Sequence, residues 1–486
     1  MKTIMACVCA AAVMYLAGSC SDNVPVVNPK PVMPSADIVL GMVHSGDIML
    51  EDVIVTDGYN FTRTDRNGQF TLHLSDNAEY VYVVSPSGYV CDYSSGAPEF
   101  YRKASSKTFD FDLLPVQSAE DYSLVVMADP QTKNDEQFGK FCAAPLADLS
   151  SVCKARAAEC FTAGICLGDV VQDAMELLPE YKSMMKETGV PFYAVIGNHD
   201  YNAKSSGEKA AEDFKKVFGP LNYAFYIGRD IVVGLNTVIY NGNKKFDEGY
   251  PPEAIGFLRG LMELVPADMH VYVAQHIPFH RWYEKDPIRG GDQVLEILAG
   301  HEVDFITGHT HVHNTLMLGE NMIDHNISGF LGAWWAADYC RDGTPRGYKI
   351  FDWRDGDLSW IFRSVEFGDG PMSQAEIVRP GQSEVHPEAV LLNVWDMDDK
   401  WTVMWHQGSS AKAPMTRVND YSPVFIKNIN EAFPDGNIPS YSTPSSSRHF
   451  FSAIPDPAAG PVKIELTNRF GIKWNYEIPV VNELKP

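Results

Sequence analysis

The pattern of apolar and polar positions changes twice along the chain. Over residues 37–115, apolar side chains alternate with polar ones in short stretches, as at Phe70, Leu72 and Leu74 after the turn at 65–68. Alternation with a period of two, bounded by Asp-Gly and Asn-Gly turns, is typical of β-hairpins. We therefore expect a small all-β sandwich over 37–115, and its sequence suggests no chemistry.

Over residues 116–370, longer apolar runs alternate with stretches of helical period. The apolar runs lie at 122–128, 161–167, 192–196, 231–235, 271–275 and 303–307. The helical stretches lie near 135–158, 173–187, 252–264 and 291–300. Near-continuous apolar strands that alternate with helices predict an α/β domain with both sheet faces covered.

Strand patterns return over residues 371–486. Apolar runs at 390–395 and 401–405 flank an Asp/Lys turn, and runs at 462–467 and 472–477 flank a second turn. This pattern predicts a second small all-β sandwich. The chain is thus expected to be multidomain, with a central α/β domain between two all-β domains.

The first residues predict export. Residues 1–19 hold one early lysine, an apolar stretch and small residues before Cys20, which resembles a bacterial lipoprotein signal whose cysteine becomes lipidated. An ordinary cleaved signal peptide is the alternative. Residues 20–36 contain several prolines and predict an extended tether. We expect an exported protein, anchored through lipid on Cys20 in the cell envelope, at the outer membrane, facing the periplasm or the cell surface.

The charge balance excludes one class of partner. The 486 residues include 39 Lys and Arg against 63 Asp and Glu, a formal net charge of −24. Such a chain repels polyanions at long range, so we expect no nucleic-acid partner. A small phosphorylated ligand stays compatible, because a bound metal reverses the local field. Nothing in the composition indicates an oligomeric state.

Residues of metal-binding type follow five of the predicted central strands. The five groups are Asp129-Pro130-Gln131, Gly168-Asp169, Gly197-Asn198-His199-Asp200, His276 and Gly308-His309-Thr310-His311. Ligand sites in α/β sheets form at the carboxyl ends of strands, so these groups are expected to converge at one sheet edge. Asp, Asn and His together suit divalent metals such as Mn, Fe or Zn.

These motifs, in this order and at strand ends, resemble the calcineurin-like metallophosphoesterase family over about residues 120–330. The resemblance implies a four-layer β-sandwich covered by helices, with the accessory domains seen in some bacterial members. It also implies two divalent metals (Mn, Fe or Zn, with Mg possible) as cofactors. The implied activity is hydrolysis of a small phosphate mono- or diester.

The resemblance also assigns roles to single residues. Asp129, Asp169 and His311 would hold one metal, and the second metal would be held by Asp169, Asn198, His276 and His309. A hydroxide bridging the metals would attack phosphorus, and Asn198 would help to bind the phosphoryl oxygens. His199 would protonate the leaving group as general acid, and Asp200 would orient the protonated His199.

Gln131 departs from the family pattern, which has Asp-x-His at this motif. A glutamine offers only its amide oxygen, a weaker and harder ligand than imidazole. The first metal could then bind loosely, be Mn²⁺ or Mg²⁺, or use a water there. Gln131 is the one feature that favours an alternative function, a surface-anchored binding lipoprotein with a weakened or inactive phosphoesterase core. The presence of His199 and of all ligands of the second metal argues against it.

Residues that contact substrate are expected in loops at the same edge. The candidates are Arg281, Trp282, Trp334, Trp335 and Arg341. An arginine could pair with a second phosphate or a carboxylate, and a tryptophan could stack on a sugar or base. The alternative for the tryptophans is packing against the last domain.

Overall fold

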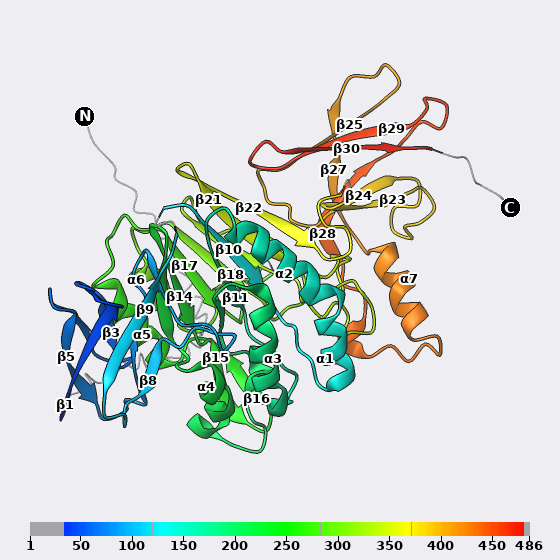
Figure 1. Ribbon diagram of the computed structural model, residues 1–486. Helices are drawn as coiled ribbons and strands as arrows, with labels where there is room; N and C mark the ends of the chain where they lie inside the picture. Colours follow the sequence, from blue (N-terminus) through cyan, green and yellow to red (C-terminus); the bar gives the residue numbers. More distant parts are fainter. Residues whose placement is uncertain (1–33, 118–119, 282, 371, 481–486) are drawn as a thin grey trace, which may run out of the picture.

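The computed structural model describes residues 34–117, 120–281, 283–370 and 372–480 (Figure 1). The predicted signal peptide, Cys20 and most of the predicted tether fall outside these residues. Among the helices of the described ranges, none has the length and apolar character needed to span a membrane.

The first core sheet has five strands in the order β12-β11-β10-β21-β22. The parallel strands are β10 (Tyr122–Met127), β11 (Phe161–Cys166) and β12 (Phe192–Ala194). The antiparallel strands are β21 (Gly347–Arg354) and β22 (Asp357–Ser364). Two strands of this sheet, β21 and β22, therefore come from a part of the chain that follows the last predicted metal motif, at 308–311.

Helices connect the parallel strands of this sheet and lie over it (Figure 1). They are α1 (Asp135–Cys142), α2 (Ala144–Ala157) and α3 (Leu178–Met184), flanked by the 3₁₀ turns η1 (Met175–Leu177) and η2 (Met185–Thr188). The single helix predicted near 135–158 is broken at Ala143. Pro145 lacks a backbone N–H, so it fits the first turn of α2 but not a helix interior.

The second core sheet has six strands in the order β13-β14-β17-β18-β20-β19. They are β13 (Tyr223–Ile227), β14 (Asp230–Leu235), β17 (Val271–Gln275), β18 (Val303–Thr307), β19 (Asn314–Met317) and β20 (Met322–Asn326). Strands β14, β17, β18 and β20 are parallel. The connecting helices are α4 (Glu212–Phe218), α5 (Pro252–Met262) and α6 (Gly291–Ile297), with the 3₁₀ turns η3 (Asn198–Asp200) and η4 (Gly207–Ala211).

The two core sheets pack face to face. The hydroxyls of Tyr122 on β10 and Tyr272 on β17 are 2.9 Å apart, and the Tyr272 ring centre lies 5.5 Å from that of Phe351 on β21. All three side chains are buried. The five predicted motifs therefore come from two facing sheets, three from one and two from the other, and not from the edge of one sheet.

A two-stranded hairpin projects from the core beside these motifs. Its strands are β15 (Val238–Gly242) and β16 (Lys245–Glu248), which pair antiparallel. Asn243 and Lys244 form the turn with φ of 51° and 62°, the left-handed region that a tight turn requires. The hairpin becomes important for the site described below.

The N-terminal domain consists of two sheets. The first contains β1 (Pro34–Ser45), β2 (Ile48–Met49), β5 (Gln69–Ser75), β7 (Tyr89–Cys91) and β9 (Phe109–Pro115), and the second contains β3 (Ile54–Thr56), β4 (Phe61–Arg63), β6 (Tyr80–Val83) and β8 (Tyr101–Lys103). The rings of Phe61 and Tyr82 pack on Phe257 of α5, with ring centres 5.7 and 6.3 Å away. This domain and the core therefore share one continuous apolar cluster.

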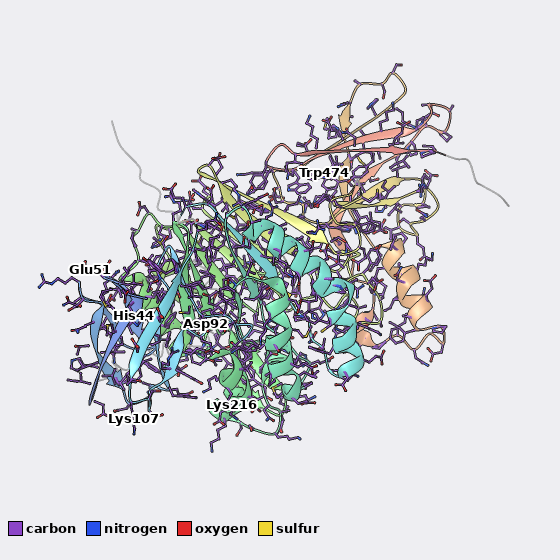
Figure 2. The ribbon with its side chains drawn as sticks, viewed as in Figure 1. His44, Glu51, Asp92, Lys107, Lys216 and Trp474 are labelled. Carbon is purple, nitrogen blue, oxygen red and sulfur yellow. The ribbon has the colours of Figure 1, made fainter. Side chains whose placement is uncertain are left out.

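The C-terminal domain also has two sheets, together with one helix. Its elements are β23 (Ala375–Val378), β24 (Val390–Val394), β25 (Thr402–Gln407), β26 (Ala413–Pro414), β27 (Thr416–Asp420), α7 (Pro423–Ala432), η5 (Ser440–Ser442), β28 (Ser447–Ala453), β29 (Val462–Thr467) and β30 (Lys473–Ile478). Strands β29 and β30 form the predicted hairpin, whereas β24 and β25 lie in different sheets. Trp474 of β30, labelled in Figure 2, stacks on Trp401, with ring centres 5.9 Å apart.

This domain has an apolar cluster of its own, and a buried ion pair joins it to the core. The Asp396 carboxylate lies 2.7 Å from Lys349 Nζ on β21 and 3.0 Å from His313 Nε2. All three side chains are fully buried. A buried charge is costly unless it is paired, so these contacts hold the domain in one position against the core.

Candidate metal centre

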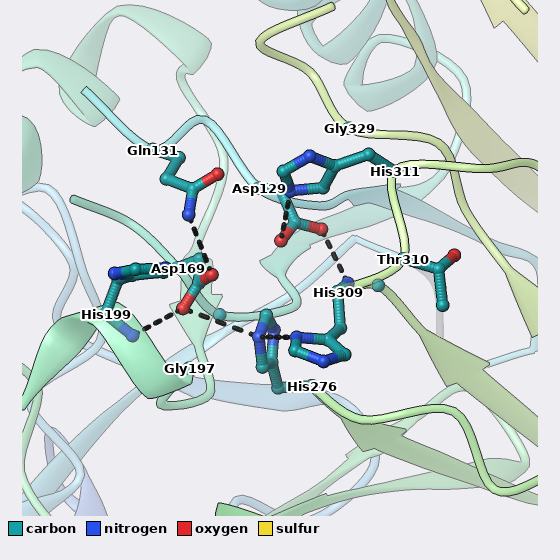
Figure 3. A network of polar contacts seen from close by, with 12 residues as sticks. Asp129, Gln131, Asp169, Gly197, His199, His276, His309, Thr310, His311 and Gly329 are labelled. Atoms are coloured by element: carbon teal, nitrogen blue, oxygen red, sulfur yellow. Dashed lines mark hydrogen bonds and ion pairs between the residues drawn. The ribbon is translucent and has the colours of Figure 1, made fainter. Parts of the chain in front are cut away.

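Loops from both core sheets bring the seven predicted metal ligands together in one place, and Figure 3 labels all of them except Asn198. Asp129 and Gln131 follow β10, Asp169 follows β11, Asn198 follows β12, His276 follows β17, and His309 and His311 follow β18. All but His309 are buried, and His309 is half-buried. Two groups of contacts can be distinguished within the set.

The first group surrounds the Nε2 atom of His276. This atom lies 3.4 Å from Asp169 Oδ1, 3.1 Å from Asn198 Oδ1 and 3.1 Å from His309 Nδ1. Asp169, His276 and His309 offer ligand atoms that all lie within 4.8 Å of one another. A carboxylate, an amide oxygen and two imidazoles directed at one point fit a divalent cation.

In His276 and in His309, one ring nitrogen is hydrogen-bonded away from the other ligands, which determines that the second ring nitrogen faces them. His276 Nδ1 lies 2.8 Å from the Leu167 carbonyl, which can only accept, so Nδ1 carries the proton and Nε2 presents its lone pair. His309 Nε2 lies 3.3 Å from Glu248 Oε1, which leaves Nδ1 to face inward. Burial lowers the pKa of His309 although Glu248 is near, which favours the neutral form that can bind a metal.

The second group contains two buried oxygens for which the described part of the chain offers no hydrogen-bond partner. They are Asp129 Oδ1, which lies 3.3 Å from His311 Nε2, and Gln131 Oε1. The Gln131 amide nitrogen donates to Asp169 Oδ2 over 3.0 Å, so Asp169 contacts both groups. An unsatisfied buried acceptor costs about 1–3 kcal/mol, so these oxygens fit a place where a cation binds.

Backbone strain is concentrated in the same loops. Five of the predicted ligands have φ between 42° and 71°: Asp129, Gln131, Asp169, His309 and His311. A left-handed conformation at a non-glycine residue costs on the order of 1–3 kcal/mol and persists only where the surrounding structure requires it. Gly197 is required for a related reason, since a Cβ there would collide with the backbone and carboxylate of Asp169.

His199 lies beside the ligands and is held by Asp169 and Asp173. Its backbone N–H donates to Asp169 Oδ1 over 2.8 Å, and its imidazole Nδ1 lies 3.3 Å from Asp173 Oδ1. Lys244 Nζ in turn lies 2.8 Å from Asp173 Oδ2. Burial alone would lower the pKa of His199, but the charges of Asp169 and Asp173 outweigh it and raise that pKa above its usual value.

The prediction that Asp200 orients His199 is wrong. The Asp200 carboxylate accepts hydrogen bonds from the backbone N–H groups of Val170, Val171 and Gly197 at 2.9–3.2 Å. Asp200 therefore ties the loop after β11 to the loop after β12, and Asp173 is the carboxylate at the imidazole. Burial and the nearby charge of Asp169 raise the pKa of Asp200 to about 7.

Two further residues of the site, Glu248 and Lys244, were absent from the prediction. Both belong to the β15–β16 hairpin, which therefore contacts a metal ligand on one side and the His199 partner on the other. Neither residue directly follows one of the predicted central strands, which is the position that the predicted metal ligands share, so the sequence pattern does not indicate them.

The predicted substrate residues have different surroundings. Arg281 lies at the site, and its terminal nitrogens bind Glu248 at 2.7 Å and Glu284 at 3.3 Å, so part of its donor capacity is already used within the protein. Trp334 is half-buried, and its ring centre lies 4.7 Å from that of His311 and 4.5 Å from that of Tyr441, so the alternative of packing against the last domain is confirmed for this tryptophan. Trp282 lies outside the described residues.

Trp335 and Arg341 are engaged in the protein interior and at a domain contact. Trp335 is 4% exposed, donates its indole N–H to the Pro130 carbonyl and packs on Phe141 of α1, so it belongs to the core, which contradicts both its prediction as a substrate residue and the alternative of packing against the last domain. Arg341 Nε donates to the Thr443 carbonyl over 2.8 Å. Arg341 thus joins the core to a loop of the C-terminal domain, and its role as a substrate residue stays a prediction.

Models of one family match almost the whole described chain. Residues 37–116 match the N terminal of Calcineurin-like phosphoesterase, residues 122–313 match Calcineurin-like phosphoesterase, and residues 324–474 match the C terminal of Calcineurin-like phosphoesterase. The chain belongs to the calcineurin-like phosphoesterase family and has its N- and C-terminal domains. Membership of this family implies divalent metal cofactors, with which the donor set above agrees.

Other comparisons add little. No curated protein matches the chain. Among solved structures, a dimetal phosphatase from Danio rerio is 13% identical, with 50% of this chain and 96% of that chain covered and a TM-score of 0.35. A purple acid phosphatase from yellow lupin is 11% identical, with 66% and 68% covered and a TM-score of 0.38. A 5'-nucleotidase from Candida albicans is 13% identical, with 52% and 54% covered and a TM-score of 0.32. At such TM-scores these likenesses carry no argument.

Proposed function

We propose that this protein is a metal-dependent phosphoric ester hydrolase that cleaves a phosphate mono- or diester. The observation that carries the proposal is the convergence of seven donor side chains, from five strand ends, beside His199. When bound, two divalent cations (Mn, Fe, Zn or Mg) would bind phosphoryl oxygens and lower the pKa of a water nucleophile.

The residues would divide between the two cations as follows. Asp169 would serve both, because its two oxygens face the two groups of ligands. Asp129, His311 and the unpartnered Oε1 of Gln131 would complete one side. The other side would be completed by Asn198, His276 and His309, whose inward-facing atoms lie around one point. Asn198 would also help to bind a phosphoryl oxygen.

His199 would act as general acid. Its Nδ1 is directed at Asp173, which leaves Nε2 to donate a proton to the oxygen of the leaving group. Asp173 stabilises the protonated ring, and Lys244 holds Asp173 in place. Proton donation of this kind is typically worth about 10²–10⁴ in rate. Trp334, beside His311, would stack on the organic part of the substrate.

The wider organisation is part of the same proposal. We propose a four-layer core over 116–370, with sandwich domains over 37–115 and 371–486, and a mature chain held in the cell envelope by lipid on Cys20. The two sheets in each terminal domain and the two facing core sheets support this division.

Hydrolysis of nitrophenyl esters tests the activity. The purified protein, stripped with a chelator and reloaded with Mn²⁺, should hydrolyse p-nitrophenyl phosphate, bis-p-nitrophenyl phosphate or both. The ratio of the two rates would separate a monoesterase from a diesterase. Inactivity on both esters with Mn, Fe, Zn and Mg would contradict the proposal and favour a binding lipoprotein.

A further inference from the structure

A separate cavity lies at the seam between the N-terminal domain and the core. Its volume is about 590 Å³, and none of the seven proposed metal ligands lines it. The N-terminal domain contributes the turn at 57–59 and residues 76–80. The core contributes Tyr201, the start of α5 and residues 238–240 of the β15 strand. The cavity is large enough for a small organic ligand.

The walls of this cavity are rich in tyrosine. The five tyrosines are Tyr59, Tyr80, Tyr82, Tyr201 and Tyr240. Tyr201 and Tyr240 stack nearly parallel, with ring centres 4.5 Å apart and an angle of 8° between the planes. Outside the lining, the ammonium of Lys103 donates to the Tyr80 hydroxyl over 2.8 Å and lies 4.2 Å from the centre of that ring. An aromatic face attracts a cation through its quadrupole.

The charged residues around the cavity are mostly acidic. Four carboxylates line it, against the single ammonium of Lys215: Asp57, Asp76, Glu79 and Glu253. Lys215 is already paired with Glu79 over 2.6 Å. The surplus of negative charge opposes an anionic ligand and favours a positively charged one.

We propose that this cavity binds a small organic cation, an amine or a quaternary ammonium compound. Aromatic walls surrounded by carboxylates are a common means of recognising such ligands, since the rings contact the alkyl groups while the acids supply the field. A bare metal ion fits less well, because the rings offer it no ligand atoms. This binding site goes beyond the proposed hydrolysis and does not depend on it.

Choline and its uncharged isostere 3,3-dimethylbutan-1-ol form a matched pair of probes. Binding of each to the purified protein would be measured by calorimetry in the presence of a chelator, so that metal content and hydrolysis play no part. Choline should bind about tenfold more tightly than the isostere. Equal binding of the two probes, or tighter binding of the neutral sugar cellobiose, would overturn the assignment of a cation.

Two variants locate the binding. Glu253→Gln removes a carboxylate at the cavity, and Tyr59→Leu removes an aromatic face while keeping bulk. Each should weaken choline binding several-fold. Two control variants should leave choline binding unchanged. They are Glu263→Gln, directly after the C-terminal end of α5, and Tyr421→Leu, in the C-terminal domain, and neither residue lines the cavity. If Tyr59→Leu fails to fold, Glu253→Gln decides alone; choline binding unaffected by Glu253→Gln would then overturn the site.

Discussion

The two halves of the proposed metal centre differ in how many hydrogen bonds hold the side chains of their proposed ligands. Around His276, both imidazoles have their outer nitrogens bound, to the Leu167 carbonyl and to Glu248. Around Asp129, the side chain of Gln131 is held by one hydrogen bond, from its amide nitrogen to Asp169, and its oxygen has no hydrogen-bond partner among the described residues. The unusual ligand thus lies in the half with fewer supporting contacts.

The largest effect is expected from Asp169→Asn, because one carboxylate oxygen of Asp169 contacts each half. Loss of its charge should reduce hydrolysis to background and reduce the bound metal at the same time. Metal content by mass spectrometry and nitrophenyl phosphate hydrolysis would be measured on the same preparation. A variant that retained two metals per chain would show that Asp169 does not bridge.

The next effect concerns His199, which belongs to neither half. His199→Ala should lower the rate on an alkyl phosphate by about 10²–10⁴ and affect a nitrophenyl ester far less, because nitrophenolate leaves without a proton. Metal content should stay unchanged, as the imidazole is not a ligand. Equal losses on both esters would remove the role of general acid.

A smaller effect is expected from the support of His309. Glu248→Gln keeps the size of the side chain but removes the charge beside His309 Nε2, and should weaken metal binding in the half around His276 by about 10–100-fold. Competition with a fluorescent chelator would measure it. Glu284→Gln is the matched control, because Glu284 also pairs with Arg281 and has no recorded contact with His309 among the described residues. Equal weakening in both variants would assign the effect to Arg281.

The smallest effect is expected from Gln131→His. An imidazole should raise the preference of the less supported half for Zn²⁺ or Fe²⁺ over Mn²⁺ and Mg²⁺, with a change of only a few-fold in the rate. Metal titrations of the stripped protein with each ion would compare the two proteins. An unchanged order of metal preference would mean that residue 131 does not contact the metal.

Much of the core could be predicted from local pattern. Strands β17 and β18 agree residue for residue with the apolar runs at 271–275 and 303–307, since a strand buried on both faces is apolar throughout. Periodicity does not say which strands pair, however. The division of the parallel strands between two facing sheets depends on side chains far apart in sequence, such as Tyr122 and Tyr272.

The candidate site likewise could be predicted where it depends on local sequence, but not where it depends on contacts between distant loops. The proposed metal ligands can be predicted because each directly follows the carboxyl end of an apolar strand. Asp200 was assigned by its adjacency to His199, but its side chain is used by the backbone of neighbouring loops, whereas Asp173 reaches the imidazole from another loop. The burial of Trp335 could not be predicted, because it depends on contacts with residues far away in the sequence, such as Pro130.

The β15–β16 hairpin has a consequence for how this protein can diverge. Lys244 reaches the proposed proton donor through Asp173, Glu248 supports a proposed metal ligand, and Tyr240 lines the separate cavity. The three tasks are encoded in one short contiguous segment, so insertion or deletion of residues there would alter all of them at once. Exchange of this segment between relatives would transfer proton donation, metal affinity and ligand preference as a single inherited unit.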